Sequence, residues 1–508
     1  MVFTRVRLNF TGVLCICLLV AFFVKTLIQR WRHRKQYAFM ASIPGPIAFP
    51  LIGANYLALG ITMSNVCGRL KSFVKHYPKI GGYWDGEEPH LITGDREIFN
   101  AILSSQQNID KFRHYEHFKV QNMTNVVNGI FVSSGDDWRL IRKMINPCFR
   151  TKILTTFDEN FFYHVNIFVD QLEQHVNGDA FDVFLPVHLC TMDLICDNMI
   201  HSRMDVQKKN LAYLSHSMTR HAEMIFERAF SPLLWSDLVY KLVGKWKLHN
   251  EYLTKEFNFL EEILTRRIEE RDKFKATTSA AEGEGTFIDV LLENLDLKII
   301  TRDRVFSEIM DMFVAGSITT ALTNSWVFKL LAMFPEIQEG AYQEIMENCT
   351  DGKVTPNDLP KLVYLEMIIK ETLRHFSVPV TGRRITEDLK VNEKLTIPAG
   401  IQVFLCAYTL HHDPQYWQKP GEFYPDHFSP ANEASRPKGA YVPFLSGPRA
   451  CPGKTYAMRS IKFLVANTLL RFKFSTDERP PPDVRDLDYR LIFMIWPTSG
   501  YNVKISKR

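Results

Sequence analysis

The segment Phe444-Leu-Ser-Gly-Pro-Arg-Ala-Cys-Pro-Gly453 is the most informative part of the sequence, because it places one Cys in a turn made largely of Gly and Pro. The glycines let backbone N–H groups approach the sulfur of Cys451, and the apolar helix expected after the turn directs its positive end toward it. Both effects favour the thiolate, the form of Cys that binds metal. A buried structural thiol is the simpler alternative, but such thiols usually lie within regular elements. The segment therefore predicts a metal-binding thiolate, with Arg449 placed to meet an acidic group of a cofactor.

The fixed positions Phe444, Gly447, Arg449, Cys451 and Gly453 match the pattern F-x-x-G-x-R-x-C-x-G, which resembles the haem loop of the cytochromes P450. The resemblance extends across nearly the whole chain. It implies the fold of that family, an α+β fold that is mainly α with small β-sheets, and haem b with the Cys451 thiolate as axial ligand of the iron. It also implies a monooxygenase that inserts one oxygen atom from O2 into a hydrophobic substrate.

Three stretches resemble family 4 of these enzymes, and more narrowly its insect branch. They are residues 287–292, the helix around Gly316, and residues 441–447 followed by 470–475. Many mammalian members of family 4 carry a Glu that bonds covalently to the haem. Ala315 occupies that position here, so no such bond is expected.

The composition is that of a globular protein. The 508 residues are 46% hydrophobic, and 61 Lys and Arg against 56 Asp and Glu give a formal charge of +5. This excess is too small for a dedicated nucleic-acid binder, so no nucleic-acid partner is expected. The nine Cys form no CxxC pair, which argues against structural zinc and against a disulfide scaffold.

Hydrophobic periodicity predicts a mainly helical body with a few short strands. The long helical patterns cover residues 248–275, 303–334, 359–375 and 457–472. Short β-branched or apolar runs cover residues 90–93, 395–397, 401–407 and 491–496. These runs are too few and too scattered for a large sheet, so small sheets at the margin of a helical domain are expected.

The first 35 residues predict a membrane anchor. Residues 8–24 carry no charge, and extension to residue 28 gives the ~20 residues that a bilayer requires. Five Lys and Arg follow this stretch and two precede it, which places the body in the cytosol by the positive-inside rule. No small-residue cleavage site follows, so a signal peptide is disfavoured. With the resemblance to microsomal enzymes, this predicts a single-pass protein of the endoplasmic reticulum membrane. Residues 36–52 form a proline-rich hinge, and residues 53–508 form the catalytic domain.

Glu371 and Arg374 lie three residues apart on one face of a predicted helix and resemble the family's E-x-x-R pair. Taken alone, the pair would be a surface salt bridge. The resemblance makes it a buried ion pair that locks the core beneath the haem, with a structural role. His427 stands where an Arg usually joins this pair, which predicts a weaker network whenever the imidazole is neutral.

The resemblance also assigns residues to the two propionates of the haem. Trp138 and Arg142 match the W-x-x-x-R helix, and Arg383 matches a strand that faces the substrate. With Arg449, these make three guanidinium partners for the propionates. Arg384 remains an alternative to Arg383, because the spacing from the Glu-Arg pair is one residue shorter than in the most similar members.

The central helix contains Ala315-Gly-Ser-Ile-Thr-Thr320, where the family has [A/G]-G-x-[D/E]-T-T. By this resemblance Gly316 leaves space for O2 at a local opening of the helix, and Thr319 hydrogen-bonds bound dioxygen. Ile318 replaces the acid that assists proton delivery. We therefore expect poor coupling between NADPH consumption and product formation.

Electrons must come from a separate protein, because no GxGxxG motif opens a helix and no flavin domain is present. The resemblance implies NADPH–cytochrome P450 reductase, with cytochrome b5 as a second donor. The acidic surfaces of such partners would meet a basic face, for which the candidates are Arg139, Lys143, Arg150, Lys152, Lys438 and Lys454. For each of these residues, a solvated surface charge with no role in docking is an equally good interpretation.

Two other classes of function stay open at this point. One is a haem-thiolate protein that has lost turnover and binds or senses lipophilic ligands, which Ile318 and His427 favour. The other is a membrane scaffold without haem, which requires the Cys451 loop to be coincidental. The segments expected to line the pocket are residues 122–131, 231–235, 314–317, 378–380 and 493–495, nearly all apolar. A fatty acid, a terpenoid hormone and a foreign compound are not distinguished by them.

Overall fold

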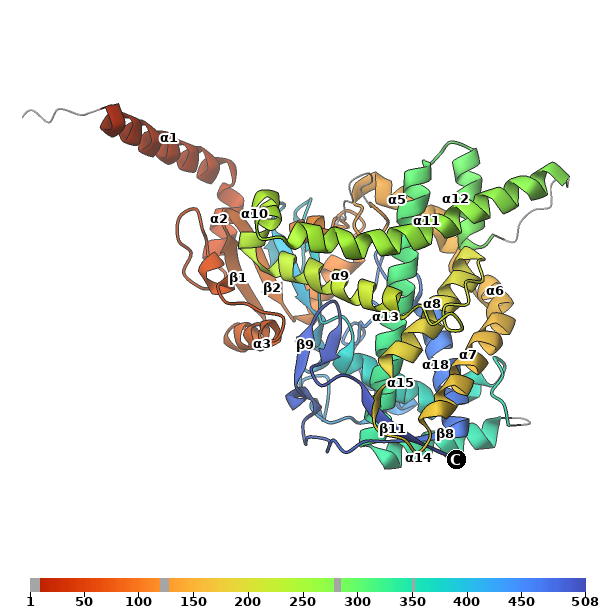
Figure 1. The fold of residues 1–508 in the computed structure, drawn as a ribbon. Helices are drawn as coiled ribbons and strands as arrows, with labels where there is room; N and C mark the ends of the chain where they lie inside the picture. Colours follow the sequence, from red (N-terminus) through yellow and green to blue (C-terminus); the bar gives the residue numbers. More distant parts are fainter. Residues whose placement is uncertain (1–9, 119–127, 278–284, 350–351) are drawn as a thin grey trace, which may run out of the picture.

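The computed structural model describes residues 10–118, 128–277, 285–349 and 352–508. Helices dominate this part of the chain, as predicted (Figure 1). The α-helices are α1 (Phe10–Arg32), α2 (Arg34–Ala41), α3 (Val66–His76), α4 (Arg96–Ser104), α5 (Gly135–Ile145), α6 (Thr151–Leu154), α7 (Asp158–Leu172), α8 (Phe184–Ile200), α9 (Ala212–Phe230), α10 (Asp237–Leu242), α11 (Lys245–Thr277), α12 (Phe287–Asp296), α13 (Arg302–Met333), α14 (Pro335–Asn348), α15 (Val363–Phe376), α16 (Ala407–His411), α17 (Pro430–Ser435) and α18 (Lys454–Arg471).

The strands form small sheets, the largest with the order β1-β2-β7-β4. In it β2 runs parallel to β7, with His90 opposite Gln402, while the other two pairings are antiparallel. The remaining strands pair as β3-β11-β8, β9-β10 and β5-β6. The strand bounds are β1 (Ile80–Asp85), β2 (Glu88–Thr93), β3 (Phe181–Asp182), β4 (Val380–Arg384), β5 (Leu389–Lys390), β6 (Thr396–Ile397), β7 (Gln402–Cys406), β8 (Phe472–Ser475), β9 (Tyr489–Leu491), β10 (Ile495–Pro497) and β11 (Asn502–Lys507).

The long helix α13 forms the centre of the body, where it packs on α8, α15 and α18 (Figure 1). Thr301 caps its first turn, because the Thr301 hydroxyl accepts the backbone N–H of Arg304 at 3.2 Å. At its other end Phe334 separates it from α14, whose first residue is Pro335. Most of its side chains are buried in the main hydrophobic core, so this helix is the fixed support of the site.

The N-terminal helix α1 projects away from the body (Figure 1). Several of its apolar side chains are exposed, including Leu19 at 65% and Phe23 at 63%. Among the residues described, α13 is the one helix long and apolar enough to cross a bilayer, and 67% of that stretch is buried, as in a core helix. The anchor at residues 1–35 therefore stays a prediction, and residues 1–9 lie outside the described part.

Candidate active site

The loop before α18 holds Cys451 through backbone contacts. The backbone N–H of Cys451 donates to the carbonyl oxygen of Phe444 at 2.9 Å, and that of Ala450 donates to Gly447 at 3.1 Å. Gly447 has φ +70°, and a Cβ there would lie 1.8 Å from the carbonyl oxygen of Leu103. Only Gly fits this position, so the Gly in the sequence pattern has a steric reason.

The loop surrounds the sulfur of Cys451 with the donors that the sequence predicted. Burial raises the pKa of the Cys451 thiol, while the N–H groups of Gly453 and Lys454 and the charge of Arg142 lower it less. For the free thiol, desolvation is the larger of these effects. A coordinated metal cation would supply the missing stabilisation, because coordination deprotonates a thiol.

An internal cavity of about 280 Å³ brings the predicted site residues together. The haem-type loop contributes Phe444, Arg449 and Cys451 to its wall, α5 contributes Trp138 and Arg142, and α13 contributes Gly316 and Thr319. These groups come from widely separated parts of the sequence, yet they face one space. Arg383 is the one predicted site residue that does not line it.

Arg383 lies just behind the cavity wall, fully buried on β4 with 1% exposure. Its Nη1 donates to the carbonyl oxygen of Gly382 at 2.9 Å, and its Nη2 has no partner among the described residues. Burial and the neighbouring charge of Arg383 lower the pKa of Arg449 to about 9. The N–H groups of Arg449 already donate to the backbone carbonyl oxygens of Ile109, Ile130 and Ser133, so its charge, and not a free donor, favours an anion nearby. The two propionates of a haem would supply such anions, so the cationic residues fit the cofactor.

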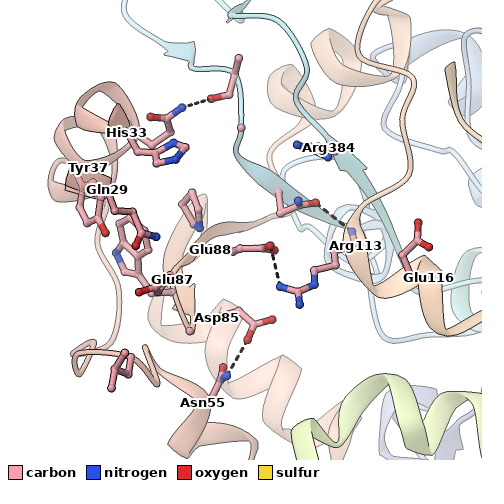
Figure 2. A pocket seen from close by; sticks show the side chains of 18 of the residues that line it. Gln29, His33, Tyr37, Asn55, Asp85, Glu87, Glu88, Arg113, Glu116 and Arg384 are labelled. Atoms are coloured by element: carbon pink, nitrogen blue, oxygen red, sulfur yellow. Dashed lines mark hydrogen bonds and ion pairs between the residues drawn. The ribbon is translucent and has the colours of Figure 1, made fainter. Parts of the chain in front are cut away.

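The alternative partner, Arg384, has a different environment. Neighbouring residues of a strand point to opposite faces, and Arg384 is exposed where Arg383 is buried. Arg384 lines an outer cleft of about 940 Å³ between α1, α2 and the edge of β1 and β2 (Figure 2). Figure 2 shows this cleft crossed by polar contacts, including Arg113 to Glu88 at 2.8 Å. The cleft is larger than the inner cavity but contains none of the other predicted site residues.

On α13, the structure gives Gly316 a packing role beside the predicted one. A Cβ at Gly316 would lie 2.4 Å from Cδ1 of Ile195 on α8, so Gly permits the close approach of these two helices. The predicted local opening is absent, because α13 is regular throughout and the Thr319 hydroxyl donates to the Ala315 carbonyl at 2.6 Å. Ile318 is buried in the main core, away from the cavity.

The Glu371–Arg374 network is buried and almost fully hydrogen-bonded. Arg374 donates through Nε and Nη2 to the two carboxylate oxygens of Glu371 at 2.8 and 2.7 Å. Its N–H groups also donate to the carbonyl oxygens of His411, Pro420 and Glu422. Burial alone would raise the pKa of Glu371, but the charge and hydrogen bonds of Arg374 hold it well below its usual range.

His427 joins this network as a hydrogen-bond partner. Its Nδ1 lies 3.2 Å from both carboxylate oxygens of Glu371. A permanent cation is also close, because Arg436 stacks 4.0 Å from the ring centroid of Trp417 and donates to the carbonyl oxygen of His427. Arg436, which the sequence reasoning did not single out, thus offsets part of the charge lost at position 427.

The cavity wall is less apolar than the sequence predicted. Lys111, Glu308 and Asp311 also line it, and none of them was expected there. The signal for Asp311 is the helical spacing 311, 315, 319, which puts it on the same face as Ala315 and Thr319. No comparable signal exists for Lys111, since its position depends on a loop.

Only some of the segments expected to line the cavity do so. Ile130, Phe131, Val378 and Phe493 line the cavity, while residues 122–127 lie outside the described residues. The segment 231–235 does not reach the cavity. The turn after α9 leads this segment outward. Trp235 instead lines the outer cleft that contains Arg384 and a second outer cleft.

A Cys in a Gly-framed loop, cationic side chains and a Thr on the facing helix share one cavity, which is the arrangement that a haem-thiolate oxygenase requires. The family model described as "Cytochrome P450" matches residues 43–504. The chain is 31% identical to cytochrome P450 4V2 of Mus musculus over 94% of this chain and 92% of that protein. It is 27% identical to cytochrome P450 4c3 of Drosophila melanogaster (97% and 94%) and 28% identical to cytochrome P450 4c21 of Blattella germanica (90% and 93%).

The chain therefore belongs to the cytochrome P450 family. Members of this family bind haem b through a Cys thiolate and are monooxygenases. The predicted family, fold class and cofactor are confirmed, and the resemblance to family 4 agrees with the names of these mammalian and insect relatives.

Proposed function

We propose that this chain inserts one oxygen atom from O2 into a hydrophobic substrate, such as a lipid, a hormone or a foreign compound, with electrons from NADPH delivered by a separate reductase. The observation that carries the proposal is the cavity that unites Cys451, Thr319 and the cationic groups around one space. Family membership supports the reaction class.

In this proposal the cofactor is held at two places. Cys451 would supply a thiolate ligand to the iron, and Trp138, Arg142, Arg383 and Arg449 would bind the propionates. The unpartnered Nη2 of Arg383 supports this role, because a buried donor without an acceptor is costly. When bound, haem supplies the one-electron and O2 chemistry that side chains lack.

The remaining residues prepare the space for that chemistry. Apolar lining excludes water, which strengthens each polar interaction inside. The Thr319 hydroxyl holds a proton at the cavity wall and can exchange its bond to Ala315 for one to a ligand. No carboxylate stands beside it, because Ile318 is apolar and buried. We therefore keep the prediction of poor coupling between NADPH consumption and product formation.

We further propose that α1 anchors the protein in the endoplasmic reticulum membrane with the body in the cytosol. Exposed apolar side chains on α1, on residues 47–59 and at Leu233 support a lipid contact. NADPH–cytochrome P450 reductase is the proposed electron donor, with cytochrome b5 as a second one. The six cations suggested for their docking are exposed: Arg139, Lys143, Arg150, Lys152, Lys438 and Lys454.

The reaction is tested with purified protein, reductase and NADPH. We expect a thiolate-type carbon-monoxide difference spectrum, and product from one of a panel of lipophilic candidates that shift the Soret band. Cys451→His should abolish that spectrum while the helical circular dichroism is kept. Retention of the thiolate spectrum would remove the assignment of Cys451. A normal spectrum without product from any binder would favour the ligand-binding or sensor function.

The anchor is tested by carbonate extraction of membranes. The full-length chain should stay in the pellet, and deletion of residues 1–35 should release it only in part, because the exposed apolar segments still touch lipid. Extraction of the full-length chain as a soluble protein would contradict the anchor.

A further inference from the structure

The charged side chains that line the cavity do not all have partners. Five of them face it: Lys111, Arg142, Glu308, Asp311 and Arg449. The two arginines are assigned to the propionates. Glu308 is engaged through both oxygens, since Arg304 donates to one at 2.7 Å and the backbone N–H of Ile130 donates to the other at 3.1 Å. Lys111 and Asp311 are left.

Asp311 uses only one of its two oxygens. The backbone N–H of Phe131 donates to its Oδ2 at 2.7 Å, and a Cβ at Gly129 would lie 2.3 Å from this oxygen, so Gly129 makes room for the carboxylate. No other hydrogen bond to Asp311 occurs among the described residues. Its second oxygen therefore has acceptor capacity left in a cavity that is otherwise largely apolar.

Lys111 is in the complementary situation. Its ammonium group lies 4.2 Å from the ring centroid of Tyr115 and 4.9 Å from that of Phe131, and Nζ makes no hydrogen bond or ion pair within the described part of the chain. Burial and the neighbouring charges of Arg383 and Arg449 lower the pKa of Lys111, and burial raises that of Asp311, so each group is held in the cavity at a cost. They interact electrostatically but are too far apart to pair directly.

We propose that Lys111 and Asp311 form a polar subsite that binds a hydroxyl group of an otherwise lipophilic substrate. A hydroxyl can accept from the ammonium and donate to the carboxylate at the same time. It is neutral, so it brings no further charge into the cavity. This inference rests on the proposed monooxygenase function and narrows its substrate class to lipophilic alcohols.

The position of the subsite fixes the orientation of such a substrate. Asp311, Ala315 and Thr319 lie on one face of α13, and the helical rise puts Asp311 about 12 Å from Thr319. A substrate held by its hydroxyl at Asp311 would present atoms far from that hydroxyl to Thr319.

The test uses the full-length holoenzyme and two isomeric probes, decan-1-ol and 1-methoxynonane. They have the same atoms and nearly the same length, but only the alcohol has an O–H donor. Dissociation constants are measured from the change in Soret absorption. We expect the wild-type protein to bind the alcohol about tenfold more tightly, as one hydrogen bond to a charged group implies.

Asp311→Asn is the decisive variant, because its amide oxygen can still accept the N–H of Phe131. We expect the tenfold preference to fall to within about twofold of equality. Asp303→Asn removes a charge from an exposed position of the same helix and should keep the full preference. Equal binding of the two probes by wild type, or an undiminished preference in Asp311→Asn, would overturn the subsite.

A second variant tests the lysine. Lys111→Met should weaken the binding of both probes, because each has an oxygen that can accept from the ammonium, while haem transfer to a haem-scavenging protein keeps its wild-type rate. Faster haem loss with unchanged affinity for both probes would show that Lys111 serves the cofactor's carboxylates, and the two-residue subsite would be wrong. A protein without the thiolate-type carbon-monoxide band would contradict the proposed function itself, whereas a normal band without alcohol preference contradicts the subsite alone.

Discussion

The Glu371–Arg374 network and the cavity wall are both buried and charged, but they differ in how far their polar groups are satisfied. In the network, Arg374 meets Glu371 and three backbone carbonyl oxygens. At the cavity, Asp311 has a carboxylate oxygen without a donor among the described residues, and behind the wall the Nη2 of Arg383 has no partner among them. Buried groups whose hydrogen bonds are all made within the protein stabilise the fold, whereas buried groups with an unused donor or acceptor are candidates for binding a ligand. Substitutions in the two regions should therefore affect different quantities.

The largest effect is expected in the network. Arg374→Met leaves Glu371 buried without its cation, which should lower the free energy of unfolding by about 3–5 kcal/mol. The control is Lys390→Met, since Lys390 and Glu393 form an i,i+3 pair at 2.8 Å but are 63% and 89% exposed. That substitution should cost less than about 1 kcal/mol. Urea unfolding followed by circular dichroism measures both, and similar costs would contradict the comparison.

Ile318→Asp tests the missing acid of α13. Because Ile318 is 6% exposed in the core, a carboxyl there would be buried without a partner, at a cost of about 2–4 kcal/mol. A carboxylate that meets water could raise the ratio of product to NADPH, but this burial keeps water away from the new group. We expect lower stability and unchanged coupling, with Ile318→Val as the control. Improved coupling without loss of stability would show that an acid at this position reaches water.

Arg383→Met should act on the cofactor and much less on the fold. Loss of a charged donor to a propionate should speed haem transfer to a haem-scavenging protein about tenfold. Arg384→Met is the matched control, because Arg384 is its exposed neighbour on β4 and should leave the rate unchanged. If haem transfer were faster from Arg384→Met than from Arg383→Met, Arg384 would be the propionate partner instead of Arg383.

The smallest effect is expected at His427. His427→Gln removes one of several hydrogen bonds to Glu371, whose carboxylate keeps Arg374 and the backbone N–H of Tyr424. The cost should stay near or below about 1 kcal/mol. A loss comparable with that of Arg374→Met in urea unfolding would show that the imidazole carries the charge that Arg supplies in relatives.

The sequence predicted best those features that depend on neighbouring residues. The Cys451 loop and the Glu371–Arg374 pair are short local patterns, so the residues that take part in them can be named from the sequence alone. The four long helices were also placed within a few residues, except that a short turn at Leu359–Lys361 precedes α15. Local propensity and periodicity carry enough information for such features.

Features that depend on register or on distant loops were missed. The choice between Arg383 and Arg384 depends on which face of β4 is buried, and that is set by pairing with β7. Lys111 reaches the cavity because a loop carries it there. In each case the missing information is the position of a second segment.

The parallel pairing of β2 with β7 has a consequence for biosynthesis. The two strands are separated by roughly 310 residues, so β2 leaves the ribosome about 15–60 s before its partner at ordinary rates of translation. During that interval β1 and β2 form only a hairpin, with one strand edge open and an apolar face uncovered. If α1 has already entered the bilayer, the incomplete sheet lies close to the membrane surface during this interval. The nascent chain should therefore depend on chaperones until residue 406 has emerged.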